Sequence, residues 1–163
     1  MLETARLQLR ELDAGDADFI VALLNDPAFI EFIGDRGVRT PHDALGYVTR
    51  IRESYLRHGF GLYVVLQRSD GRPTGLCGLV RRDSLPSVDL GFALLPEFRR
   101  HGYGLESATA VLAQAKALGI DPLLAICSPQ NLGSRALLER LGFRFIKQLV
   151  LDGESAESCW YER

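Results

Sequence analysis

Cysteine is scarce in this chain of 163 residues, which has only three, far apart at Cys77, Cys127 and Cys159. Such a number and spacing do not form the disulfide framework of a small secreted domain. No Cys-x-x-Cys pair occurs, and the three histidines are not spaced as zinc ligands. We therefore expect a chain that folds without disulfides, in a reducing compartment, and that has no metal site.

Excess charge and long apolar runs are also missing. The 19 Lys and Arg residues nearly balance the 21 Asp and Glu residues, for a net charge of −2. This balance provides no general attraction to nucleic acid or to an anionic membrane, so any bound anion needs a local site. No hydrophobic run approaches the roughly 18 residues of a membrane span, and Met1–Arg6 contains no export signal. A cytoplasmic location is the default expectation.

The chain does contain what one folded domain requires, with 47% hydrophobic and 25% charged residues over 1–163. Strand patterns are found over 4–10, 60–67, 74–81, 88–95, 122–127, 143–150 and 156–162. Helical patterns begin at Asp13 and Pro41, recur over 105–118 and 132–141, and are joined by a short helix over 27–33. The order predicts an α/β (α+β) fold: a mixed, mostly antiparallel sheet of six or seven strands flanked by about four helices.

The most informative segment is Pro96–Leu105, which joins the strand at 88–95 to a helix. Gly102 and Gly104 allow the backbone to turn tightly and to bring several N–H groups to one point. The N-terminus of a helix favours negative charge, and Arg99 and Arg100 add positive charge beside it. This segment predicts a pyrophosphate site. The alternative is a glycine-containing helix start with solvated arginines.

Two nucleotide-binding motifs can be tested against this loop. The P-loop motif fails because no lysine follows Gly104. The dinucleotide fingerprint G-x-G-x-x-G has Ser107 in place of its third glycine, and Asp121 precedes the next strand instead of ending it. A Rossmann-type protein is therefore a weak rival interpretation.

Four segments resemble the GCN5-related N-acetyltransferase (GNAT) superfamily. Arg99–Gly104 is similar to its R/Q-x-x-G-x-G/A signature. Leu2–Arg10, the strand Asp89-Leu90-Gly91-Phe92, and Asn131–Phe143 resemble segments of the subgroup that contains the ribosomal-protein N-terminal acetyltransferases. The segments follow the family's order over nearly the whole chain. The resemblance implies a sheet whose strands splay into a V-shaped cleft.

What the resemblance implies chemically is transfer of acetyl from acetyl-CoA, as a co-substrate, to an amine. The pantetheine arm would lie along the strand at 88–95 and pair with backbone groups of Phe92, Ala93 and Leu94. Asn131 would reach the arm from the other side. The backbone N–H groups that would hold the pyrophosphate are those of His101, Gly102, Tyr103, Gly104 and Leu105.

Asp89 is the candidate general base. It shares a strand face with Gly91 and Ala93, whose small side chains leave room for a ligand. The corresponding family position usually holds glutamate, so the shorter aspartate favours a bridging water. The N–H of Leu94 could stabilise the oxyanion. The alternative for Asp89 is a solvated residue at a strand end.

The sequence shows no evident general acid that would protonate the departing thiolate of coenzyme A. Leu138 stands where many family members have a tyrosine, so Ser134, one turn earlier, is the replacement candidate and a further cofactor contact. Its alternative role is simply that of a residue in a helix capped by Asn131. Cys127 could in principle form an acyl-enzyme, but buried cysteines are usually inert, and direct attack in a ternary complex is expected.

Three functions remain open. The first is acetylation of a protein N-terminal α-amine, the second is acetylation of a small amine such as an amino acid, polyamine or drug. The third is an acyl-CoA-binding module without turnover, which the missing tyrosine and shortened base keep open. Dimerisation is common in the subgroup, but no feature of this sequence decides whether the chain forms a homodimer.

Overall fold

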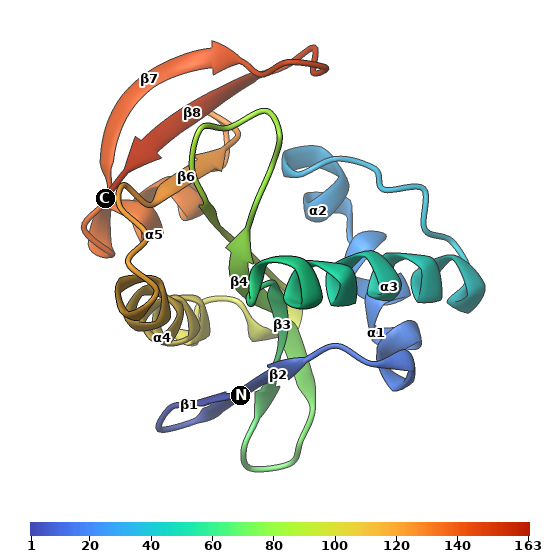
Figure 1. Ribbon diagram of the computed structural model, residues 1–163. Helices are drawn as coiled ribbons and strands as arrows, with labels where there is room; N and C mark the ends of the chain where they lie inside the picture. The colour runs from blue at the N-terminus through green and yellow to red at the C-terminus, as the bar shows by residue number, and fades with distance from the viewer.

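The computed structural model describes residues 1–163 and contains one eight-stranded sheet in the order β1-β2-β3-β4-β5-β6-β8-β7 (Figure 1). Every neighbouring pair is antiparallel except β5 and β6, which are parallel. The strands are β1 (Leu2–Glu3), β2 (Leu7–Glu11), β3 (Leu62–Gln67), β4 (Pro73–Val80), β5 (Asp89–Leu94), β6 (Leu124–Cys127), β7 (Arg144–Val150) and β8 (Glu157–Glu162).

Five α-helices cover the two faces of this sheet. They are α1 (Ala17–Leu24), α2 (Pro27–Phe32), α3 (Pro41–His58), α4 (Tyr103–Ala117) and α5 (Leu132–Arg140). Short 3₁₀ turns precede α1 at Ala14–Asp16 and α4 at Pro96–Phe98. None of the helices combines the length and the hydropathy that crossing a bilayer requires.

The predicted mixed fold is confirmed, with two corrections to its counts. The sheet has eight strands instead of six or seven, and there are five α-helices instead of about four. The additional strand is β1 at Leu2–Glu3, which precedes the predicted strand at 4–10. The backbone N–H of Thr4 bonds to the carbonyl of Leu7 at 2.9 Å, and this turn separates the two-residue β1 from β2.

Local signals in the sequence explain where the helices begin and end. Thr40 and Asp43 form a reciprocal capping box at the start of α3, next to a proline in the first turn. Gly59 ends that helix in the left-handed conformation at φ 76°, which a residue with a side chain rarely adopts. Asp13 accepts a hydrogen bond from the backbone N–H of Gly15 and caps the turn that leads into α1.

Two hydrophobic clusters lie on opposite faces of the sheet. The larger one packs α4 and α5 against one face, through residues such as Val111 and Leu138. The other packs α1 and α3 against the opposite face, through residues such as Ile20 and Val48. Figure 1 shows this division, with α4 and α5 on one side and α1, α2 and α3 on the other. The site described below therefore lies between two separately packed layers.

The sheet opens between β5 and β6. These parallel strands pair only at two positions, Asp89 with Leu124 and Leu90 with Ala125, and they diverge beyond. Helix α4 makes the crossover between them, as the order of elements predicts. On its other edge, β5 pairs with β4 over its full length. One edge of the second half of β5 is therefore left without a neighbouring strand, which is the V-shaped splay implied by the resemblance.

Candidate active site

A cleft of about 560 Å³ occupies the splay. Its walls come from β5, from the loop before α4, from the first turns of α5, and from α2 and α3 on the opposite side. Its volume lies within the range of roughly 300–1,000 Å³ that is typical of small-molecule sites.

The free edge of β5 offers main-chain groups to this cleft. The N–H of Leu95 bonds to the carbonyl of Thr74 in the β4 direction at 2.8 Å, and the register from Asp89 to Leu94 is unbroken. Alternation along an antiparallel strand then directs the backbone groups of Ala93 toward β4 and those of Phe92 and Leu94 toward the splay. The carbonyl of Leu94 accepts from Nε of Arg99 at 3.1 Å. Main-chain contacts to a ligand are therefore available at Phe92 and Leu94 but not at Ala93, which lines the cleft by its methyl group.

The loop before α4 is shaped to collect amide groups. Arg100 and Gly102 both adopt positive φ angles, of 62° and 81°. The first hydrogen bond of the helix runs from the N–H of Glu106 to the carbonyl of Gly102 at 3.0 Å, and no side chain caps the helix start. Consequently the N–H groups from Arg100 to Leu105 have no acceptor in the chain. Consecutive free amides at a helix N-terminus form a site for an anion.

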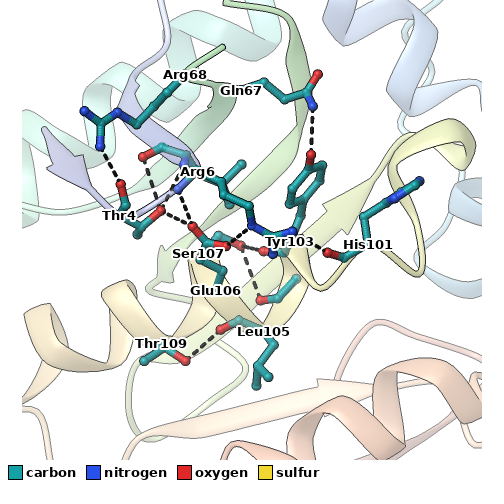
Figure 2. A network of polar contacts seen from close by, with 12 residues as sticks. Thr4, Arg6, Gln67, Arg68, His101, Tyr103, Leu105, Glu106, Ser107 and Thr109 are labelled. Atoms are coloured by element: carbon teal, nitrogen blue, oxygen red, sulfur yellow. Dashed lines mark hydrogen bonds and ion pairs between the residues drawn. The ribbon is translucent and has the colours of Figure 1, made fainter.

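Arg6 on the turn before β2 holds this loop from behind (Figure 2). Its Nη1 donates to the carbonyl of His101 at 2.9 Å, and its Nε is 2.7 Å from Oε2 of Glu106 in the first turn of α4. Thr4 donates to the same carboxylate at 2.6 Å. The guanidinium also lies 4.7 Å from the ring centre of Tyr103. Local sequence patterns did not identify Arg6, because its partners lie far along the chain.

The predicted loop residues divide into two groups. Arg99, Arg100, Gly102, Gly104 and Leu105 line the cleft, whereas His101 and Tyr103 do not and can contribute only backbone groups. The Arg99 guanidinium bonds to the buried carboxylate of Asp26 at 2.5 Å, which ties the loop to the start of α2. Arg100 is exposed and forms no ion pair.

Asn131 and Ser134 lie on the far wall of the cleft. The side chain of Asn131 accepts a hydrogen bond from the N–H of Ser134 at 3.1 Å, so it caps α5 as well as lining the cleft. Leu138, where a tyrosine is common in the resembling family, is 1% exposed in the core. Among the predicted residues of α5, only Ser134 has a hydroxyl at the cleft.

Asp89 is placed differently from a solvated strand-end residue. It is 1% exposed, and its carboxylate lies 3.0 Å from Nε of Arg82 in the connection after β4. Burial raises the pKa of Asp89, and the charge and hydrogen bond of Arg82 offset this only in part. The cleft is lined by Arg82 and not by Asp89. The carboxylate therefore faces Arg82, and any contact with a bound amine needs a bridging group.

Comparison with known proteins identifies the family. The sequence profile described as "Acetyltransferase (GNAT) domain" matches residues 6–144. The chain belongs to this family. Among curated proteins, it is 28% identical to the uncharacterized N-acetyltransferase YjdG of Bacillus subtilis, over 96% of this chain and 94% of the relative. It is 23% identical to YnaD of the same organism, over 93% and 89%.

Solved GNAT structures share the fold over almost the whole chain. A protein assigned to the GNAT family from Bordetella pertussis is 26% identical, with a TM-score of 0.81 and coverage of 99% of this chain and 98% of its own. An acetyltransferase from Agrobacterium tumefaciens superimposes with a TM-score of 0.85 at 24% identity, covering 99% and 92%. The resemblance noted from the sequence is confirmed at the level of family and fold.

The cleft also contains a cysteine whose environment makes it a poor nucleophile. Cys127, at the end of β6, faces the cleft. Burial raises the pKa of its thiol to about 12, and neighbouring Cys159 acts in the same direction. A thiol in this environment stays protonated near neutral pH and is a poor nucleophile.

Proposed function

We propose that the protein transfers acetyl from acetyl-CoA to a primary amine, foremost a protein N-terminal α-amine. The observation that carries this proposal is the run of free amides from Arg100 to Leu105 beside a splayed strand. Two proteins of the same fold support the choice of cofactor. RimL, a ribosomal L7/L12 α-N-protein acetyltransferase, has been solved with coenzyme A, and MccE with acetyl-CoA and AMP, at TM-scores of 0.83.

The cofactor would lie along the cleft with its diphosphate on the loop amides, which the dipole of α4 assists. The amide-containing pantetheine arm would pair with the free backbone groups of Phe92 and Leu94, in the way that a neighbouring strand would. Asn131 and Ser134 would close the other side. Acetyl-CoA then supplies an activated acyl group, and the residues of this chain position it.

The reaction would begin with an unprotonated amine. An α-amine with a pKa of about 7.7–8.0 is on the order of 10% free at pH 7, whereas a lysine at about 10.4 is below 0.1% free. A cleft that lacks an exposed carboxylate at Asp89 therefore suits an α-amine better than a lysine. Asp89 as general base would act through a water molecule and remains a prediction.

The amine nitrogen would attack the thioester carbonyl carbon directly, with the N–H of Leu94 stabilising the oxyanion. Collapse of the intermediate breaks the C–S bond and releases the thiolate of coenzyme A, and the attacking nitrogen loses its extra proton to water. A thiol pKa of about 8.5 makes this a good leaving group, so Ser134 is needed at most as a proton donor to it. The unreactive state of Cys127 favours this direct route over an acyl-enzyme.

Binding and turnover test the proposal separately. Calorimetry should detect coenzyme A binding far more tightly than pantetheine, which lacks the diphosphate. Release of thiol from acetyl-CoA should then occur with some members of a panel of peptides and small amines. Absence of binding at millimolar coenzyme A would overturn the assignment of the cleft. Binding without turnover on any amine would instead indicate the acyl-CoA-binding module.

A further inference from the structure

The cleft has a second end, away from the loop amides. The strand β5 runs from Asp89 to Leu94, so the two ends lie about 16 Å apart at about 3.3 Å per residue. Besides β5 and the loop before α4, the connection after β4, the helices α2 and α3, and the β7–β8 hairpin line the cleft. Arg82 of that connection bonds to Asp89. Figure 1 shows the β4–β5 connection rising between α2 and that hairpin. If the diphosphate occupies the loop end, the acceptor enters at this one.

Arg82 presents unused hydrogen-bond donors there. Its Nε is taken by Asp89 at 3.0 Å, while its two Nη groups have no acceptor in the chain. The side chain is 34% exposed and lines the cleft, whereas Asp89 behind it is 1% exposed. A guanidinium anchored through Nε by a buried carboxylate keeps its outer donors aimed in one direction.

Two further donors lie at the same end. Tyr47 lines the cleft, and its hydroxyl makes no hydrogen bond within the chain. Burial raises the pKa of Tyr47, and the positive charges of Arg36, Arg50 and Arg82 act against this rise. Arg36 also lines the cleft and forms no ion pair. Against these donors, Glu154 on the β7–β8 hairpin is the one carboxylate that lines the cleft.

We propose that Arg82, positioned by Asp89, binds a carboxylate on the acceptor, with Tyr47 and Arg36 as additional donors. A singly charged carboxylate fits these donors. Glu154 can bind the acceptor's amino group while that group is still protonated. The acceptor is thus a primary amine that also carries a carboxylate. It comes from one of two sources, a free amino acid or a peptide with an acidic residue near its N-terminus. This inference rests on the proposed acetyl transfer.

This positioning role for Asp89 replaces the general-base role considered under the proposed function, and the two roles differ in their consequences. A base accelerates attack by every amine, so its loss lowers the rate for neutral and acidic acceptors alike. A positioning residue acts only through the contact that Arg82 makes, so its loss affects acidic acceptors alone.

The experiment compares pairs of acceptors that differ by one carboxylate, with each rate expressed per concentration of unprotonated amine, because amidation of an amino acid also lowers the pKa of its α-amine. One pair is an amino acid and its amide, and the other is a peptide beginning with an acidic residue and the same peptide with the corresponding amide. Rates of thiol release give kcat/KM for each acceptor with the wild type, Arg82→Gln, Arg82→Lys and Asp89→Asn. Arg81→Gln is the matched control, because Arg81 is exposed and does not line the cleft. Calorimetry with coenzyme A verifies that each variant is folded.

We expect the wild type to favour the acid over the amide by about tenfold or more in at least one pair. Arg82→Gln and Asp89→Asn should lose this preference equally, with unchanged KM for acetyl-CoA, and Arg82→Lys should keep part of it. Equal rates for acids and amides in the wild type would overturn the inference and leave acetyl transfer intact. Asp89→Asn slowing the amides as much as the acids would overturn the positioning role. No turnover with any amine would overturn the transfer itself.

Discussion

Arg6 and His101 are joined by a hydrogen bond that fixes which way the anion-binding loop faces. The Arg6 Nη1 atom lies 2.9 Å from the carbonyl oxygen of His101. A trans peptide is planar, with its C=O and N–H pointing in opposite directions. Because the His101 carbonyl points to Arg6, the N–H of Gly102 in the same peptide points away from Arg6. Gly102 itself lines the cleft. Arg6, which does not line the cleft, thereby orients the N–H of Gly102, which does.

Arg6→Ala should weaken the use of acetyl-CoA without altering the chemical step. We expect KM for acetyl-CoA to rise by about tenfold and kcat to change little, because the loop amides become less ordered. With S-acetylpantetheine, which has no diphosphate, the variant and the wild type should react at the same rate. Steady-state kinetics on the two donors measure this. Arg57→Ala, an exposed change on α3, serves as the control, and an equal loss on both donors would contradict the role of Arg6.

Gly102→Ala should combine strain with loss of binding. Gly102 has a φ of 81°, and an added Cβ would lie 3.1 Å from Nη2 of Arg6. We expect a loss of about 1–2 kcal/mol in the free energy of unfolding, together with clearly weaker binding of coenzyme A. Gly119→Ala introduces similar strain at φ 70° in open space, away from the cleft. Denaturant titration should show destabilisation in both variants, and calorimetry should show weaker binding only in the first.

Glu106→Gln should change how stability depends on pH. Burial alone would raise the pKa of Glu106, but hydrogen bonds from Thr4 and Arg6 outweigh burial and leave the pKa below its ordinary value of 4.5. The ionised carboxylate therefore stabilises the fold above that pH, and the contribution is lost as the pH falls through the lowered value. We expect wild type and variant to differ by about 1 kcal/mol near pH 7 and to converge in acid. Denaturant midpoints measured from pH 7 to pH 3 test this, and a difference that grows in acid would contradict it.

Cys127→Ala should leave turnover within about twofold of the wild type. The thiol faces the cleft, but burial raises its pKa to about 12, so the nucleophilic thiolate is rare at neutral pH. Mass spectrometry of the wild type after mixing with acetyl-CoA should show no acetylated enzyme. An acetyl adduct on this cysteine, or a large loss of activity in the variant, would indicate a two-step route.

Much of the fold could be predicted because its signals are local. The β3–β4 hairpin follows from two apolar strands around a turn at Ser69–Pro73, and α4 follows from helical spacing after Gly104. The strand β1 was missed because two residues carry no periodicity. The anion-binding loop could be predicted as well, because its glycines, its arginines and the start of the helix are adjacent in the sequence.

The contacts that support the site could not be predicted in the same way. Arg6 and Glu106 are 100 residues apart, and only the packing of the turn before β2 against α4 brings them together. The alternation along β5 correctly grouped Asp89 with Gly91 and Ala93, but it did not reveal that Arg82 covers the carboxylate. Such long-range pairs depend on tertiary structure, which a single sequence does not display.

The divergence of β5 and β6 after two paired residues has an energetic consequence for the whole molecule. The sheet forgoes several interstrand hydrogen bonds at its centre, and a ligand that bonds to Phe92 and Leu94 replaces part of what the missing neighbour would supply. Such a ligand binds the native state and not the unfolded chain, so its binding raises the melting temperature in proportion to the logarithm of its concentration. Acetyl-CoA would thus act as a structural element of the folded protein as well as the source of the acetyl group.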